Sequence, residues 1–156
     1  MFRGFSQSGD DEEVQSAFAA RADRVAEQSA RLEGRLRETR GEFPAENSLP
    51  GLITESFARW PHSNVPDERL MQNVILAYAL EMAECAIYEA LIGAADAAGD
   101  TETARIAREI QATEMGAAGE FLHFLPSRSK IAFNMLTVTE VDPAVETRTL
   151  ENRVLQ

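Results

Sequence analysis

The residues of this sequence that are best placed to do chemistry are three glutamates on otherwise apolar helix faces. Between positions 70 and 95, residues spaced alternately by four and three fall on one face of a helix. Most of them are apolar, but Glu81 and Glu84 interrupt the face, and Glu114 interrupts a similar face in the next predicted helix. A charge placed against a core is costly unless it is paired, protonated or bound to a cation. The three glutamates therefore predict a buried site that holds positive charge.

Three interpretations of these glutamates are open. Carboxylates that face the inside of a helical bundle are typical ligands of iron or manganese, so Glu81, Glu84 and Glu114 are the candidate metal ligands. Alternatively, the glutamates pair with Arg21, Arg24 or another arginine inside the bundle, which replaces a metal by an ionic contact. In the third interpretation the register is wrong, and the glutamates do not face the interior.

The two histidines are weaker candidates for ligands. Glu120 and His123 have the Glu-x-x-His spacing of di-metal proteins. His123, however, is nine positions from Glu114, which places it about half a turn away from the face that carries the glutamates. His62 lies in a proline-rich connection. We therefore expect neither histidine to bind a metal.

Catalysis has little support elsewhere in the sequence. Tyr88 follows the two glutamates on the same face and is expected to be a core tyrosine, and the single cysteine, Cys85, is expected to be a small buried apolar residue. The sequence has no Ser/His/Asp set, glycine-rich phosphate loop or CxxC pair. Hydrolase, nucleotide-binding and disulfide-exchange functions therefore lack a signal, and we expect no catalytic residue.

Helical periodicity and proline positions predict the elements that hold these residues. The predicted helices are 14–40, a short crossover helix near 50–59, 67–98, 102–125 and a short helix from Ser127 to about Leu136. Pro126 is expected to end the third long helix. The predicted fold is an all-α, antiparallel helical bundle with three long helices, one short crossover helix and a short C-terminal helix. Residues 1–136 form the bundle domain, and residues 137–156 form a tail or a packing arm.

Composition limits the partners. The 156 residues carry a formal net charge of −11, which disfavours nucleic acid and anionic membrane surfaces. The first 13 residues lack the pattern of a signal peptide, and the longest apolar run, Val74–Leu80, is too short to span a bilayer. With one cysteine, no disulfide can form within the chain. These features predict a cytoplasmic protein.

The glutamate-bearing helix also carries a family resemblance. Residues 81–88 read E-M-A-E-C-A-I-Y, which resembles the E-H-x-E-I-A-x-Y helix of the ferritin-like stress-protein family typified by YciF. Residues 28–33 resemble the Q-x-x-R-L-E that ends an earlier helix of that family, and residues 51–55 resemble its G-L-x-x-E. Ile110 and Glu114 continue the match, so the resemblance extends over residues 18–125. It implies a ferritin-like fold, a bacterial stress-associated role and dimerisation.

The departures from this family fall on its metal ligands. Met82 stands where the family has a histidine, and Thr113 replaces the first residue of an acidic doublet. The family's H-x-x-E-T stretch falls on residues 21–25, with Arg21 and Arg24 at positions where ligands are expected. The family also begins with another long helix, for which the residues before Val14 leave no room.

Two functions follow from these observations. The first is a non-catalytic ferritin-like bundle without a cofactor, which acts as a structural or stress-associated interaction module. The second is a carboxylate-based protein that binds iron or manganese in a degenerate di-metal site. In both cases we expect a homodimer or a larger homo-oligomer. A protein partner could also dock through the tail, residues 137–156.

Overall fold

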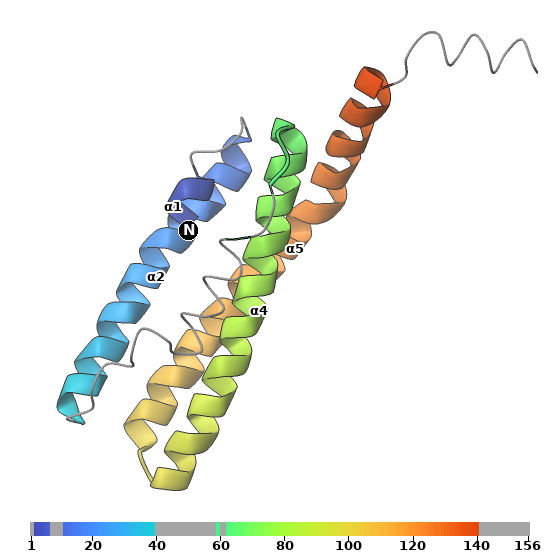
Figure 1. Cartoon of the computed structure of the whole chain (residues 1–156). Helices are drawn as coiled ribbons and strands as arrows, with labels where there is room; N and C mark the ends of the chain where they lie inside the picture. The colour runs from blue at the N-terminus through green and yellow to red at the C-terminus, as the bar shows by residue number, and fades with distance from the viewer. Residues whose placement is uncertain (1, 7–10, 40–58, 60–61, 141–156) are drawn as a thin grey trace, which may run out of the picture.

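The computed structural model describes residues 2–6, 11–39, 59 and 62–140, and the elements in this part of the chain are all helices. Their bounds are α1 Phe2–Phe5, α2 Glu12–Glu38, α4 Pro66–Ala98 and α5 Thr101–Glu140. The helices α4 and α5 form a long hairpin, and α2 lies along this hairpin (Figure 1). The prediction of an all-α helical bundle is confirmed.

Ion pairs between the helices define their directions. Arg24 of α2 pairs with Glu120 of α5, and Arg31, further along α2, pairs with Glu109, which comes earlier in α5. The helix α2 is therefore antiparallel to α5. Since α4 and α5 are also antiparallel, α2 and α4 run in the same direction, as Figure 1 shows. A long connection must therefore return the chain from the end of α2 to the start of α4.

Local sequence accounts for where these helices begin and end. The Asp11 side chain accepts a hydrogen bond from the Val14 N–H at 3.1 Å and caps α2, and Pro66 occupies the first turn of α4, where its missing N–H is harmless. At the end of α4, Gly99 adopts a φ of +71°, which glycine tolerates best. Asp100 then caps α5 by accepting from the Thr103 N–H at 3.0 Å.

The C-terminal part of the bundle corrects one prediction. The third long helix does not end at Leu125 before a separate short helix at 127–136, because α5 continues through Pro126 to Glu140. A proline removes one backbone donor, but packing can hold a helix together across it. Phe124 and Ala132 are both buried on the two sides of Pro126, and Arg128 pairs with Asp11 of α2 at 2.8 Å. These contacts hold the part of α5 that flanks Pro126 against the bundle.

Three other segments differ in how they compare with the predictions. The short helix α1 is present, although the sequence pattern did not predict it. The crossover helix expected near 50–59 lies outside the described residues, apart from residue 59. Of the expected tail, residues 137–140 belong to α5, and residues 141–156 lie outside the described part of the chain.

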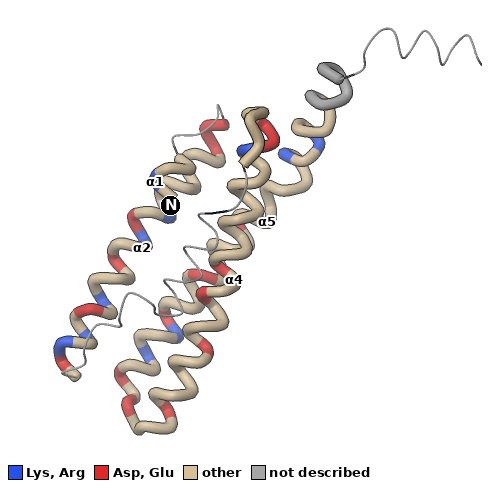
Figure 2. The backbone as a smooth tube through the Cα atoms, in the orientation of Figure 1, with Lys and Arg blue, Asp and Glu red and all other residues tan. Residues whose placement is uncertain are grey.

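The core lies between α1, α2 and the hairpin. Its largest cluster is aromatic: the rings of Phe2, Phe18 and Phe121 have centroids 5.2 to 6.4 Å apart. Charged residues follow α2 along its length, whereas α4 has a long stretch with few charges (Figure 2). Among the described helices, none has the length and apolar character to cross a membrane.

Candidate functional site

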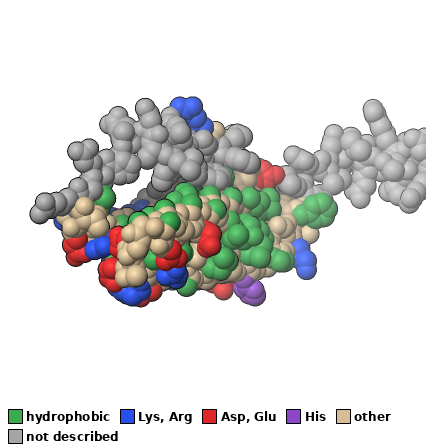
Figure 3. Space-filling view, turned by 90° about the horizontal axis from the view of Figure 1, so that it is seen from below, with side chains coloured by type: hydrophobic (Ala, Val, Ile, Leu, Met, Phe, Trp, Pro, Cys, Tyr) green, Lys and Arg blue, Asp and Glu red, His purple; other side chains and the backbone are tan. Residues whose placement is uncertain are grey.

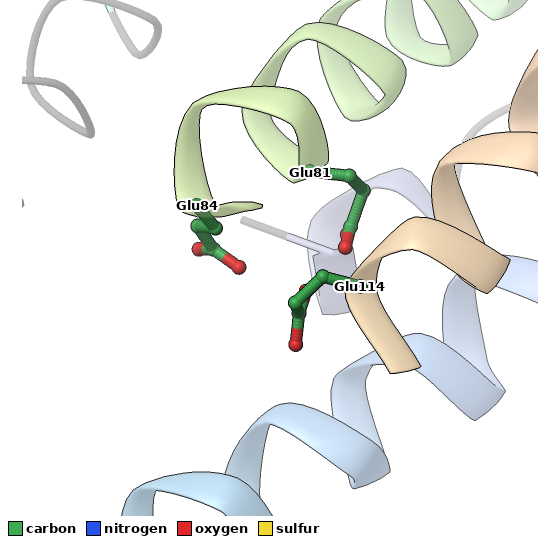
Figure 4. A group of neighbouring side chains, drawn as sticks. All are labelled: Glu81, Glu84 and Glu114. Atoms are coloured by element: carbon green, nitrogen blue, oxygen red, sulfur yellow. The ribbon is translucent and has the colours of Figure 1, made fainter. Parts of the chain in front are cut away.

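Three glutamates meet at one level of the bundle. Glu81 and Glu84 lie one turn apart on α4, because residues three apart share a helix face, and Glu114 faces them from α5. Each of the three offers a carboxylate oxygen, and these oxygens all lie within 4.8 Å of one another. In Figure 4 the carboxylates point towards a common space between α4, α5 and α2. The structure thus brings together the predicted residues.

Arg21 of α2 lies among these carboxylates. Its Nε donates to Glu81, and one terminal nitrogen donates both to Glu84, at 2.8 Å, and to Glu114. The other terminal nitrogen donates to the side-chain oxygen of Gln28 at 3.0 Å. Arg21, Glu81 and Glu114 are each 0% exposed, so the cluster is an interior one.

The predicted pairing of the glutamates with an arginine is therefore confirmed for Arg21. The second candidate, Arg24, does not contact the three glutamates through any ion pair that the structure describes. It reaches Glu120 at the surface instead, at 3.5 Å, and both of those side chains are exposed. The interpretation that the glutamates face away from the interior is wrong for Glu81 and Glu114.

Burial and crowding shift the titration of the cluster. Burial, together with a hydrogen bond to Glu114, raises the pKa of Glu81 to about 9, although Arg21 opposes the shift. Burial and the nearby charge of Glu114 raise the pKa of Glu84 to about 7. For Arg21, burial lowers the pKa, but the hydrogen bond to Glu81 and the charges of all three glutamates together leave the pKa raised. One guanidinium does not balance three ionised carboxylates, which agrees with the raised pKa values of Glu81 and Glu84.

Two carboxylate oxygens of the cluster provide separate evidence for a bound proton. Glu81 Oε2 and Glu114 Oε1 are buried, and neither has a hydrogen-bond donor among the described residues when both groups are ionised. A proton on Glu81 allows its carboxyl group to donate to Glu114, which satisfies both groups. The hydrogen bond between these two side chains is one of the causes that raise the pKa of Glu81. The orphaned oxygens and the raised pKa therefore both favour a protonated Glu81.

The donor set alone would suit a metal, but its surroundings do not. Three carboxylates are oxygen ligands of the kind that iron and manganese accept. The guanidinium of Arg21, however, hydrogen-bonds all three of them, and arginine keeps its charge at any ordinary pH. A divalent ion held by the same oxygens would lie within a few ångströms of this cation and be repelled by it. The residues therefore do not fit a metal while Arg21 occupies this position.

Sequence reasoning missed two residues of the site. Gln28 lies seven residues after Arg21 and so projects from the same face of α2, a spacing that could have indicated it. Phe2 of α1 lies over the Arg21 guanidinium, with the guanidinium carbon 5.4 Å from the ring centroid, and it also stacks on Phe121. No periodic pattern leads to Phe2, because α1 has only four residues.

The remaining candidates lie in less reactive surroundings. Burial raises the pKa of Tyr88 to about 12 and also raises the pKa of the Cys85 thiol. Cys85 is buried between α4 and α5, with its Sγ 4.0 Å from the backbone oxygen of Gln111. His62 and His123 are both exposed and lie outside the glutamate cluster.

Comparison with known protein families matches residues 4–132 to the family described as Domain of unknown function (DUF892). The match includes Arg21, Gln28 and all three glutamates. No curated protein and no solved structure matches the chain significantly.

Proposed function

The chain belongs to the DUF892 family, and within this family we propose that it is a non-catalytic, ferritin-like helical bundle that acts as a structural or stress-associated interaction module. The observation that carries this proposal is the Arg21 guanidinium, which hydrogen-bonds all three glutamates of the candidate metal site. The resemblance of residues 81–88 to the YciF-type helix supports the ferritin-like and stress-associated parts of the proposal.

The chemistry of Arg21 argues against a catalytic role for the cluster. An arginine side chain donates hydrogen bonds but cannot give up its proton or accept one in a protein. Arg21 hydrogen-bonds all three carboxylates, and Glu81 and Glu114 are fully buried. An ion-paired group with buried partners is held in one arrangement, which suits a structural role.

Metal analysis tests this proposal. Protein purified without chelator should contain only substoichiometric iron and manganese when measured by inductively coupled plasma mass spectrometry. In the variant Arg21→Ala the carboxylates lose their cation, and we expect manganese or iron to bind where the guanidinium was. Arg24→Ala is the matched control, because Arg24 lies one turn away and contacts Glu120 instead. The control should bind no more metal than the natural sequence.

The alternative function is a carboxylate-based protein that binds iron or manganese through Glu81, Glu84 and Glu114. The distance of at most 4.8 Å between the three ligand oxygens favours it, and it requires the Arg21 side chain to leave the cluster. Stoichiometric metal in the natural protein that is lost in Glu81→Ala would establish this alternative and refute the first function.

A further inference from the structure

The helix α2 is attached to the hairpin in two different ways along its length. Its first half contributes Val14, Ala17 and Phe18 to the hydrophobic core cluster, and Val25 is the last residue of α2 that packs on this cluster among the described residues. Arg21 anchors the same half through its pairs with the buried glutamates. The first half of α2 therefore has both apolar burial and buried charge to hold it in place.

The second half of α2 has neither kind of contact with the described residues. No residue of α2 after Gln28 is buried, and Leu32 and Leu36 are only half-buried. Gly34 lies in the middle of this half, and a Cβ atom built on it would meet no atom within 4 Å. Glycine in a helix interior weakens the helix relative to alanine. The described contacts therefore stabilise residues 29–38, which we refer to as the strap, less than the rest of α2.

Ion pairs with α5 and with the α4–α5 turn hold the strap. Arg31 pairs with Glu109 at 2.6 Å, and both side chains are well exposed, by 37% and 47%. Arg35 pairs with Asp100 at 2.6 Å, and its Nε also donates to the Thr103 hydroxyl at 2.9 Å. Figure 3, which views the bundle from the α4–α5 turn, shows acidic and basic side chains next to one another at this end. Water and salt ions can therefore reach these ion pairs.

Salt should affect the two halves of α2 differently. The Debye length falls from about 10 Å at 0.1 M ionic strength to about 3 Å at 1 M, which weakens the attraction between exposed charges. The contacts of Arg21 are buried and are screened much less. Apolar burial in the first half does not depend on charge. A rise in ionic strength therefore weakens the attachment of the strap and leaves the first half attached.

We propose that the strap responds to ionic strength: it separates from α5 as the salt concentration rises, while the first half of α2 stays on the bundle. Gln28, whose side-chain oxygen accepts from Arg21 at 3.0 Å, is the last buried residue before the strap. Separation uncovers the carboxylates of Glu109 and Asp100 on the hairpin and frees two arginines of the strap. The response does not depend on the proposed non-catalytic function, because neither ion pair belongs to the glutamate cluster.

Distances between spin labels test this separation. In a Cys85→Ala background, labels at Arg37→Cys and Ala97→Cys report the distance between the strap and the hairpin. Both positions are exposed, and the ion pair described for Arg37 is with Glu33 of the same helix. Double electron–electron resonance at 0.05 M and 0.5 M NaCl measures the distance. It should increase by about 5 Å or more at the higher salt concentration, because residue 37 lies roughly 14 Å beyond Gln28 along the helix.

A second pair of labels reports the first half of α2. Ala19→Cys and His123→Cys lie at exposed positions of α2 and α5, and the distance between them should be the same at both salt concentrations. Circular dichroism should show that the helices are retained in each labelled variant. A strap distance that does not respond to salt would overturn the proposal. An equal increase in both distances would also overturn it, because α2 would then leave the hairpin as one unit.

Removal of the charges tests whether the ion pairs are the cause. The double variant Arg31→Gln/Arg35→Gln lacks both pairs of the strap and should show the longer distance already at 0.05 M NaCl. Arg105→Gln/Arg108→Gln is the matched control, because it removes the same charge, whereas the ion pairs described for Arg105 and Arg108 are within the hairpin. The control should keep the shorter distance at low salt. Equal distances in the two double variants would refute the role of the ion pairs.

Discussion

At Arg21 a single positive charge faces three carboxyl groups inside the bundle. We expect Arg21→Ala to lower the free energy of unfolding by roughly 3–5 kcal/mol, because it leaves buried carboxyl groups without their partner. Urea unfolding followed by circular dichroism, in the presence of chelator, measures this change. Arg24→Ala should lower the free energy of unfolding by at most about 1 kcal/mol, since the exposed ion pair with Glu120 contributes little to stability. Equal costs for the two variants would contradict the central role of Arg21.

The raised pKa of Glu81 makes stability depend on pH. The folded-state pKa is about 9, whereas the unperturbed value is 4.5, so the folded protein holds a proton that the unfolded chain releases. The resulting stabilisation is fully present below about pH 4.5 and is lost as the pH rises through about 9. Glu81→Gln cannot ionise, and its amide oxygen can still accept from Arg21.

We therefore expect Glu81→Gln to gain stability relative to the natural protein as the pH is raised from 6 to 9. Thermal unfolding at a series of pH values provides the comparison. Glu27→Gln, on the surface of α2, controls for the change of net charge. If Glu81→Gln and the natural protein lose stability in parallel over this range, Glu81 does not hold its proton in the folded state.

The glutamates of the site can be predicted from the sequence, because charged residues on an apolar helix face are easy to recognise. Glu81, Glu84 and Glu114 interrupt apolar helix faces, and the sequence offers Arg21 as one of the arginines that can pair with them. The choice between Arg21 and Arg24 needed coordinates, because both lie on α2 one turn apart and only packing decides which of them faces the hairpin. Phe2 could not be predicted, because its role depends on a contact with Arg21 that is distant in the chain.

At the scale of the helices, Gly99 separates α4 from α5 with a φ of +71°. Gly99→Ala should destabilise the protein by about 1 kcal/mol, because a Cβ atom is strained in this left-handed conformation. Gly93→Ala, in the interior of α4, should instead stabilise it by roughly 0.5–1 kcal/mol, since alanine is the better helix former. Neither new Cβ atom would meet a neighbour within 4 Å. Urea unfolding measures both changes in the free energy of unfolding. Changes of opposite sign would show that backbone conformation, and not packing, determines the effect.

Helix ends were predictable where a side chain or a glycine sets them. The helix α4 begins at Pro66 and is capped by Gly99, so its bounds agree closely with the predicted helix 67–98. Pro126 was misleading, because a local rule predicts a helix end there, whereas packing of the flanking residues continues α5 across it. The outcome at a proline within a helix depends on tertiary contacts that periodicity alone does not contain.

At the scale of the whole molecule, the described helices bury one side of the α4–α5 hairpin and leave the other side apolar and exposed. The helix α2, held by Arg21, covers the glutamates. Ile75 and Met82 on α4, and Met115 and Leu122 on α5, remain exposed by 39% to 52%. Met82 and Met115 each directly follow a glutamate of the cluster in the sequence, so they lie about 100° further round the same two helices.

The single cysteine of this chain can report whether the two helices of the hairpin separate. Cys85 lies between α4 and α5, 5% exposed, with a raised pKa that keeps it protonated. A thiol-specific reagent should therefore modify the native protein only when the two helices separate, and the rate of modification would report that opening directly. Arg21→Ala should accelerate modification at neutral pH, whereas Arg24→Ala should not. Rapid modification of the natural protein would mean that the hairpin opens freely without unfolding.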